Sequence, residues 1–328
     1  MGRETGRANR GGHIMKTRLT FLGTGTSQGI PIIGCKCPVC RSNNLKDKRF
    51  RSAAFVEYGG LSILVDAGPD FRMQMLAHDI SHLDAILLTH DHRDHTGGLD
   101  DVRSLNYIDQ RAAEIYCEES VLESLKKSFA YVFEENKYPG APEWNIHLID
   151  ERPFFVEPGD EDRKLIWVHD RGYCWQTADG ELIPTNDRKA APAETADDPS
   201  FKGGLVSSTG RGVEIIPIRG IHDKMPVLGF RFGDIAYITD MSLLPDRELK
   251  KLQGLEHVTL NTVGYKPHHS HFSLYQAIDV ARKIGAKHTW LTHLSHNFPV
   301  YMDFAAQLRE LAPDMDIQPA YDGLVIEG

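Results

Sequence analysis

Histidines and aspartates cluster in one short stretch, Thr-His-Asp-His-Arg-Asp-His at residues 89–95, directly after an apolar segment that predicts a buried strand over residues 85–88. Imidazole and carboxylate groups are ligands for Zn, Mn and Fe. In an extended segment, residues i and i+2 point to the same side, so His90 and His92 can bind one ion. Asp94 and His95 follow after the turn and can reach a second ion, and two ions about 3.5–4 Å apart are typical of displacement at phosphate. A solvated loop with incidental histidines would explain one histidine, but not three histidines and two aspartates within six residues.

A second cluster places three thiols, those of Cys35, Cys37 and Cys40, within six residues. Three thiols so close favour a metal site, although no fourth ligand lies nearby in the sequence. The redox alternative, a Cys-x2-Cys motif of the thioredoxin type, lacks the helix and pattern that surround it in such proteins. Five cysteines are an odd number and a poor disulfide framework, so we expect a reducing compartment and a cytoplasmic protein.

Composition predicts an ordinary soluble globular chain, with 41% hydrophobic and 25% charged residues in 328. The net charge of −9 argues against a nucleic-acid partner. No apolar run approaches the roughly 20 residues that span a bilayer, so no membrane partner is expected. The basic residues at the start of the chain precede no apolar region long enough for a signal peptide. Residues 1–14 are interpreted as a leader segment or as the product of an upstream start, and they are excluded from the fold prediction.

The elements that must position these clusters follow from the apolar pattern. Strands are predicted over residues 17–23, 52–58, 61–68 and 83–90, then over 212–218, 227–233, 235–240, 257–263 and 288–293. Helices are predicted over residues 69–77, 118–133, 245–252, 273–285 and 300–312. Two similar halves of strands followed by interleaved helices predict an α/β fold, a four-layer αββα sandwich with two mixed sheets face to face.

Between the halves, residues of about 151–211 are rich in Pro, Gly, Ser and Asp. We interpret them as an insertion, with one hairpin over residues 164–176 and a long loop, within a single domain of residues 15–328. Because the insertion precedes the second half's first strand, we expect it to cover the site and to affect the choice of substrate.

The stretch at 89–95 resembles the His-x-His-x-Asp-His motif of the metallo-β-lactamase fold superfamily, and further pieces follow in the expected order: Asp66, His222, Asp240 and His293. The resemblance implies that the first metal is held by His90, His92 and His222. It implies that the second is held by Asp94, His95 and His293, with Asp240 bridging both. Asp240 is also expected to take part in catalysis. Alone, His222 could be a surface histidine and Asp240 a helix cap. Asp66 could accept a hydrogen bond that orients a ligand histidine, or it could cap the next helix.

Within that superfamily, the sequence more closely resembles one branch, the phosphoribosyl cyclic phosphate phosphodiesterases of the carbon–phosphorus lyase pathway. The residues that carry this likeness lie at 23–40 and at 292–298. It implies a structural zinc held by Cys35, Cys37, Cys40 and His296. It also implies a general acid in the segment 265–274, for which His271 is the best match, while His268 and His269 compete. The alternative is that Ser270 or Ser273 caps the following helix beside exposed histidines.

The function that this resemblance implies is hydrolysis of a small phosphodiester, a cyclic ribose phosphate, by two divalent ions (Zn or Mn, with Fe as a further option). The expected partner is a small-molecule substrate, and a homodimer is left open. Rival hypotheses are a thioester hydrolase or a tRNA 3′-end nuclease on the same fold, and a non-catalytic zinc-stabilised binding or sensor protein.

Overall fold

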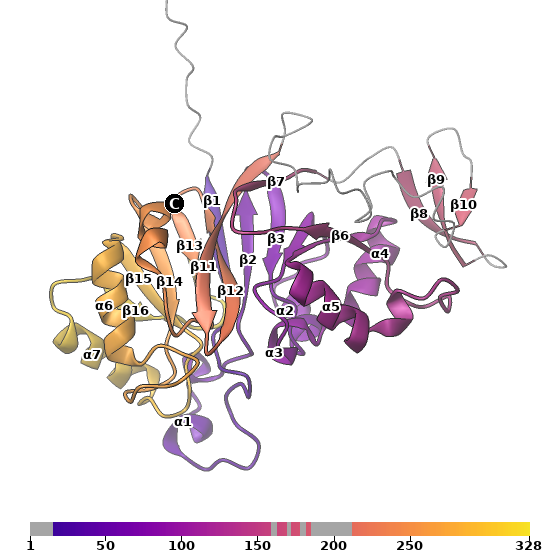
Figure 1. Cartoon of the computed structure of the whole chain (residues 1–328). Helices are drawn as coiled ribbons and strands as arrows, with labels where there is room; N and C mark the ends of the chain where they lie inside the picture. The colour runs from indigo at the N-terminus through magenta and orange to yellow at the C-terminus, as the bar shows by residue number, and fades with distance from the viewer. Residues whose placement is uncertain (1–15, 159–162, 169–171, 178–181, 185–211) are drawn as a thin grey trace, which may run out of the picture.

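The computed structural model describes residues 16–158, 163–168, 172–177, 182–184 and 212–328. Two seven-stranded sheets dominate it (Figure 1). The first has the strand order β17 (Val325–Glu327), β1 (Thr17–Gly23), β2 (Ala53–Tyr58), β3 (Leu61–Val65), β4 (Ala85–Leu87), β5 (Ala113–Cys117) and β6 (Trp144–Leu148). The second has the order β16 (Ile317–Pro319), β15 (His288–Thr292), β14 (His257–Asn261), β13 (Ile235–Tyr237), β12 (Met225–Phe232), β11 (Val213–His222) and β7 (Phe154–Val156).

Both sheets are mixed in the same way. Strands β1 to β3 pair antiparallel and β3 to β6 pair parallel, while β11 to β13 pair antiparallel and β13 to β16 pair parallel. Parallel strands need crossovers, which place helices on the sheet faces. The two halves therefore share one topology, although their sequences show no convincing repeat.

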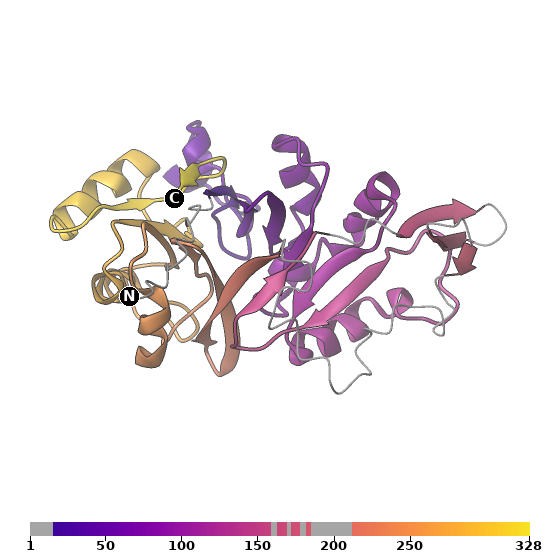
Figure 2. The same ribbon diagram turned by 90° about the horizontal axis from the view of Figure 1, so that it is seen from above.

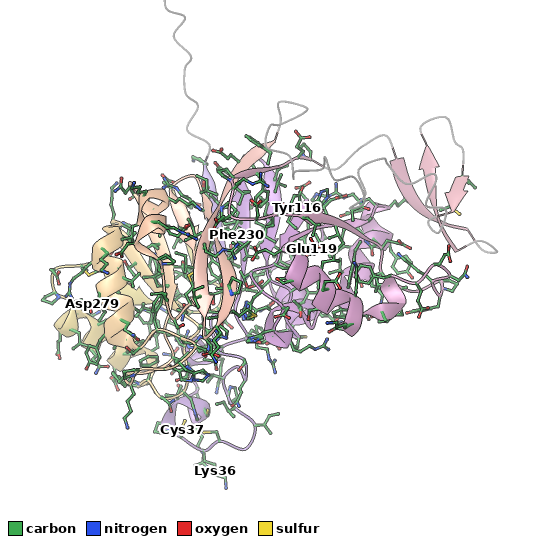
Figure 3. All side chains as sticks on the ribbon, viewed as in Figure 1. Lys36, Cys37, Tyr116, Glu119, Phe230 and Asp279 are labelled. Carbon is green, nitrogen blue, oxygen red and sulfur yellow. The ribbon has the colours of Figure 1, made fainter. Side chains whose placement is uncertain are left out.

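The sheets pack face to face through a common core in which Phe21, Val56 and Ile63 of the first meet Phe230 and Tyr237 of the second. Alternate residues of each strand point into this core, as the period of two requires. Figure 3 labels Phe230 between the layers. Burial of these large apolar side chains between two sheets is the main stabilisation of the fold.

Helices cover the outer face of each sheet. On the first sheet these are α2 (Phe71–Ala77), α4 (Arg103–Asp109) and α5 (Glu119–Ser128), and on the second α6 (Leu274–Ile284) and α7 (Tyr301–Leu311). Helix α6 buries a stripe at helical spacing, from Leu274 to Ile284, and begins with a capping box between Ser273 and Gln276. The predicted four-layer αββα sandwich is confirmed. None of the helices in the described ranges is long and apolar enough to cross a membrane.

Two predicted helices differ in detail. The segment at 245–252 is a 3-10 helix, η4 (Asp246–Leu252), because Glu248 N donates to Pro245 O at 2.9 Å and starts the tighter turn. The helix predicted to reach residue 133 ends at Ser128. Phe129 leaves the helical conformation, and its ring packs 5.3 Å from that of Trp144.

The insertion contains the predicted hairpin, β8 (Arg163–Val168) with β9 (Gly172–Thr177), and a third strand β10 (Leu182–Pro184). Figures 1 and 2 show this small sheet beyond α4, at the opposite end of the molecule from α7. Strand β7 lies inside the range predicted as insertion, yet it pairs with β11 and belongs to the second sheet. The loop predicted after the hairpin lies mostly outside the described residues.

Candidate metal centre

Strand ends from both sheets supply the clustered side chains. Asp66 follows β3, the segment His90–His95 follows β4, His222 ends β11, Asp240 follows β13 and His293 follows β15. Short α3 (Arg93–Thr96) begins inside the histidine segment and carries Asp94 and His95. The sandwich thus brings residues more than 200 positions apart to one edge.

Three of these residues adopt left-handed backbone conformations, with φ of 66° at Asp66, 57° at Asp240 and 55° at His293. Non-glycine residues rarely adopt positive φ, and such strain concentrates at functional sites. Asp66 and Asp240 both come after the third strand of their respective halves, Asp66 directly and Asp240 three residues later, and both have positive φ.

One group consists of His90, His92 and His222, whose candidate ligand atoms lie within 4.8 Å of one another. His90 Nε2 and His222 Nδ1 are buried and have no hydrogen-bond partner among the described residues. Buried polar atoms without partners are costly, and a cation at their convergence would satisfy them. Burial lowers the pKa of His90 well below its ordinary value and lowers that of His222, so both rings are held in the neutral form that binds metals.

A second group surrounds Asp240. Its Oδ2 atom lies 3.2 Å from His95 Nε2 and 3.2 Å from His293 Nδ1, and Asp94 Oδ2 lies 3.4 Å from His95 Nε2. Although burial alone would raise the pKa of Asp240, His293 and His95 hold it well below the ordinary value. Because Asp240 also lies within 4.8 Å of His222, one ionised carboxylate stands between the two groups.

Asp66 lies behind this second group and is buried. Its carboxylate accepts hydrogen bonds from Thr89 N at 2.9 Å and Thr89 Oγ1 at 2.9 Å, and lies 2.7 Å from His95 Nδ1. Helix α2 begins at Phe71 after Asp70, so Asp66 does not cap it. The contact fixes the His95 ring with Nε2 directed at Asp240.

The three cysteines meet His296 on the loop that follows β15. Its Nδ1 atom lies 3.3, 3.6 and 3.7 Å from the Sγ atoms of Cys35, Cys37 and Cys40. A tetrahedral zinc with Zn–S of about 2.3 Å and Zn–N of about 2.0–2.1 Å separates S and N ligands by about 3.5 Å, so the donor set fits zinc. Figure 3 labels Cys37 on the loop that projects from the sheets beside α1 (Pro38–Arg41).

His271 lies between the two halves of the centre. Its Nδ1 atom is 3.6 Å from Asp240 Oδ1, and its ring centroid is 4.7 Å from those of His222 and His293. Burial and the neighbouring His293 lower the pKa of His271 to about 3. Its competitors His268 and His269 are both exposed, and His268 contacts Ser270 through Nδ1. The capping alternative also applies here, because Ser273 caps α6.

A cavity of about 420 Å³ opens onto the centre. Besides metal-binding candidates and His271, its lining includes Ser27, Lys224, Met225, His269 and Ser270. No described residue of the insertion lines it, so the expected cover over the site is not found in the part of the insertion that the structure describes.

Sequence reasoning missed three contributors. Ser52 Oγ lies 3.1 Å from His293 Nδ1, Thr89 contacts Asp66, and Lys224 lines the cavity. Thr89 was detectable, because it directly precedes the histidine motif. Ser52 was not, because its contact spans 241 positions.

Comparison with known proteins agrees with this geometry. The family of the "Beta-lactamase superfamily domain" matches residues 62–162 and 180–294. A crystal structure described as a new diphosphatase from the PhnP family is 31% identical, with a TM-score of 0.71, and the match covers 96% of this chain and 98% of that one. Zn²⁺-bound PqqB from Methylobacterium extorquens, at 15% identity, TM-score 0.62 and coverage of 94% and 99%, shares the fold.

A curated relative from Porphyromonas gingivalis, an octanoyltransferase, is 34% identical over 309 residues, which are 94% of this chain. The chain spans about half of that relative, 51% of its length. The family match and the PhnP-family structure together decide the classification: this chain belongs to the β-lactamase superfamily and is PhnP-like.

Proposed function

We propose that this protein is a dinuclear metal-dependent phosphodiesterase that acts on small phosphodiesters, with a five-membered cyclic ribose phosphate as the preferred class. The observation that carries the proposal is the position of Asp240, an ionised carboxylate between the His90–His92–His222 group and the Asp94–His95–His293 group. This donor set suits two divalent ions, Zn or Mn, with Fe as a further option.

Divalent ions held by these residues would supply an activated water and would neutralise charge on the phosphoryl oxygens. The chain's own residues orient the reaction. Asp66 contacts His95 Nδ1 and so fixes the orientation of that ring. Asp240 lies between the two groups of ligands and contacts both, and the polar cavity leaves room for the ester groups of the substrate.

His271 is the proposed general acid. Asp240 Oδ1 lies at ion-pair distance from its Nδ1 and stabilises a proton there, which leaves Nε2 to donate a proton to the departing oxygen. A bound phosphodiester would add a negative charge beside the ring and oppose the lowering of its pKa by burial, by His293 and by the bound ions.

The Porphyromonas gingivalis relative is named for octanoyl transfer. We assign that activity to the half of the relative that this chain does not match. An eight-carbon chain requires an apolar pocket. Met225 is the one apolar side chain among the described residues that line the cavity. Transfer of an octanoyl group by this chain would contradict the assignment.

The test is a hydrolysis screen on protein loaded with Mn or with Zn. Cyclic and acyclic phosphodiesters are compared with acyl thioesters and with a tRNA 3′-end precursor. We expect turnover of the diesters, lost in Asp240→Ala and His92→Ala but kept in Asp246→Asn, an exposed aspartate of η4. Turnover of thioesters alone, or RNA cleavage with a steep salt dependence, would favour the rival enzymes. One tightly held zinc per chain with no further metal and no turnover would favour a binding protein.

A further inference from the structure

A buried asparagine holds the backbone directly after Asp240. Asn261 is the last residue of β14 and is fully buried. Its Oδ1 atom accepts a hydrogen bond from Met241 N at 2.8 Å, and its Nδ2 atom donates one to Met241 O at 3.0 Å. The opposite orientation of the amide would set donor against donor and acceptor against acceptor, so this orientation alone satisfies both groups. Two hydrogen bonds therefore fix the residue that follows Asp240.

Asp240 has a backbone conformation that depends on such support. Its φ is 57°, in the left-handed region, and residues held there persist only when their surroundings fix them. Its Oδ2 atom accepts a hydrogen bond from Thr239 Oγ1 at 2.6 Å and contacts His95 and His293. Loss of the bonds to Met241 would allow this turn to relax and the carboxylate to change direction.

The same backbone carbonyl also joins the segment that carries His271. Met241 O accepts a second hydrogen bond, from Phe272 N at 2.8 Å, and Phe272 directly follows His271. Asn261 and Phe272 thus share one acceptor. The carboxylate of Asp240 and the ring of His271, with Oδ1 and Nδ1 3.6 Å apart, each belong to a residue adjacent in sequence to this junction.

Asn261 is connected to the His293 loop as well. It pairs with Thr292 across β14 and β15, and Thr262 N donates to Thr292 O at 3.0 Å. Thr292 directly precedes His293. Asn261 is not among the described residues that line the cavity, so it would act on the site only through the loops that it holds.

We propose that Asn261 is a positioning residue, which sets the direction of the Asp240 carboxylate toward the metal-binding histidines and its distance from the His271 ring. The effect on catalysis rests on the proposed phosphodiesterase function, whereas the effect on metal binding needs no substrate. Leucine has nearly the shape of asparagine but would leave Met241 N buried without a partner, so Asn261→Leu removes the polar contacts and keeps the volume.

A second asparagine offers a matched control, because it makes the same contacts elsewhere in the fold. Asn106 of α4 is buried; its Nδ2 donates to Glu143 O at 3.1 Å, and its Oδ1 accepts from Glu143 N at 3.0 Å. It also donates to Arg111 O at 2.9 Å, so its replacement should cost at least as much stability. Asn106 lies on the outer face of the first sheet and is not among the described residues of the cavity lining.

The first measurement is the affinity for Mn²⁺, followed by titration and chelator competition on protein shown by circular dichroism to be folded. Carboxylate and imidazole ligands suit Mn²⁺, whereas thiolates select zinc, so the cysteine cluster contributes little. The affinity should fall about 10–100-fold in Asn261→Leu and stay unchanged in Asn106→Leu. Asn261→Ser, whose hydroxyl can bond to one of the two groups, should lose less, and it takes the place of Asn261→Leu if that variant does not fold. Equal affinities in the Asn261 and Asn106 variants would overturn the proposal.

The second measurement uses the leaving group to report the position of His271. At saturating Mn²⁺, kcat/KM is compared for an alkyl diester and a 4-nitrophenyl ester of the same phosphate. Asn261→Leu should lower kcat/KM about tenfold more for the alkyl diester, because a displaced acid cannot reach the departing oxygen. In the His271→Ala background it should produce no such difference, since no acid is left to displace.

These two measurements separate failure of the inference from failure of the proposed function. Equal losses on both esters in Asn261→Leu would contradict control of His271 by Asn261. If no diester were hydrolysed even by the wild-type protein, the proposed function would be wrong, yet the Mn²⁺ affinities of the Asn261 and Asn106 variants would still decide whether Asn261 positions Asp240.

Discussion

Asp66 and Asp240 contact opposite nitrogens of one imidazole ring, that of His95. Asp66 Oδ2 lies 2.7 Å from Nδ1, and Asp240 Oδ2 lies 3.2 Å from Nε2. Burial alone would lower the pKa of His95, but Asp240, Asp66 and Asp94 raise it well above the ordinary value. In the proposed centre the ring would be neutral, with its proton on Nδ1 toward Asp66 and Nε2 free for a metal.

Asp66→Asn should weaken metal binding while the fold persists. Asparagine tolerates the positive φ but replaces the charged acceptor for His95 by a neutral amide. Loss of such an outer contact typically costs about 10–100-fold in metal affinity. Chelator competition measures the affinity and circular dichroism monitors the fold, with Asp246→Asn as the control. An affinity equal to that of the wild-type protein would show that Asp66 does not orient His95.

Gly68→Ala should disturb the same region by steric contact. A Cβ atom on Gly68 would lie 2.0 Å from Asp94 O, and backbone cannot give way as a flexible side chain does. We expect a loss of about 1–3 kcal/mol in the free energy of unfolding, measured by urea denaturation, together with weaker metal binding. Gly264→Ala is the matched control, because nothing lies within 4 Å of its added Cβ. If Gly68→Ala and Gly264→Ala had the same free energy of unfolding, the steric prediction at Gly68 would be wrong.

The features predicted best from the sequence were those that depend only on neighbouring residues. Strands with alternating or continuous apolar residues, and the histidine segment at 90–95, can be recognised from the local sequence pattern alone. Strand β7 was missed because three residues are too few for a period of two to stand out.

Contacts between residues that are far apart in the sequence could not be predicted in this way. His222, Asp240 and His293 were found only through a resemblance, since each alone is an ordinary residue at a strand end. The two interpretations of Asp66 stayed open because its partner His95 is 29 positions away, and only the packing of β3 beside β4 brings them together. Lys224 carries no signal at all until the position of the cavity is known.

Cys37→Ser should lower the zinc content and the thermal stability together. The cysteine loop and the loop after β15 are joined by the thiols and His296, so loss of one ligand releases both. We expect a decrease of about 3 kcal/mol or more in the free energy of unfolding. Because His293 lies three residues before His296, activity should fall as well.

Cys117→Ala is the control for this prediction. Cys117 is fully buried in β5, where burial raises the pKa of its thiol to about 12, and it lies outside the cluster. Its truncation should cost stability through lost packing but leave zinc unchanged. Zinc retained in Cys37→Ser, with unchanged melting, would overturn the structural site.

His271→Ala should reduce activity in a way that depends on the leaving group. An alkoxide needs a proton as it departs, whereas 4-nitrophenolate leaves readily without one, so a general acid matters far more for alkyl diesters. The loss in kcat/KM should reach about 10²–10⁴-fold for an alkyl diester and be much smaller for the nitrophenyl ester. His269→Ala, at the exposed neighbour, should not show this dependence on the leaving group. Because His271 also lies within ligand distance of His222 and Asp240, the metal content of each variant must be measured. Loss of metal, or equal losses on both esters, would make His271 a ligand rather than an acid.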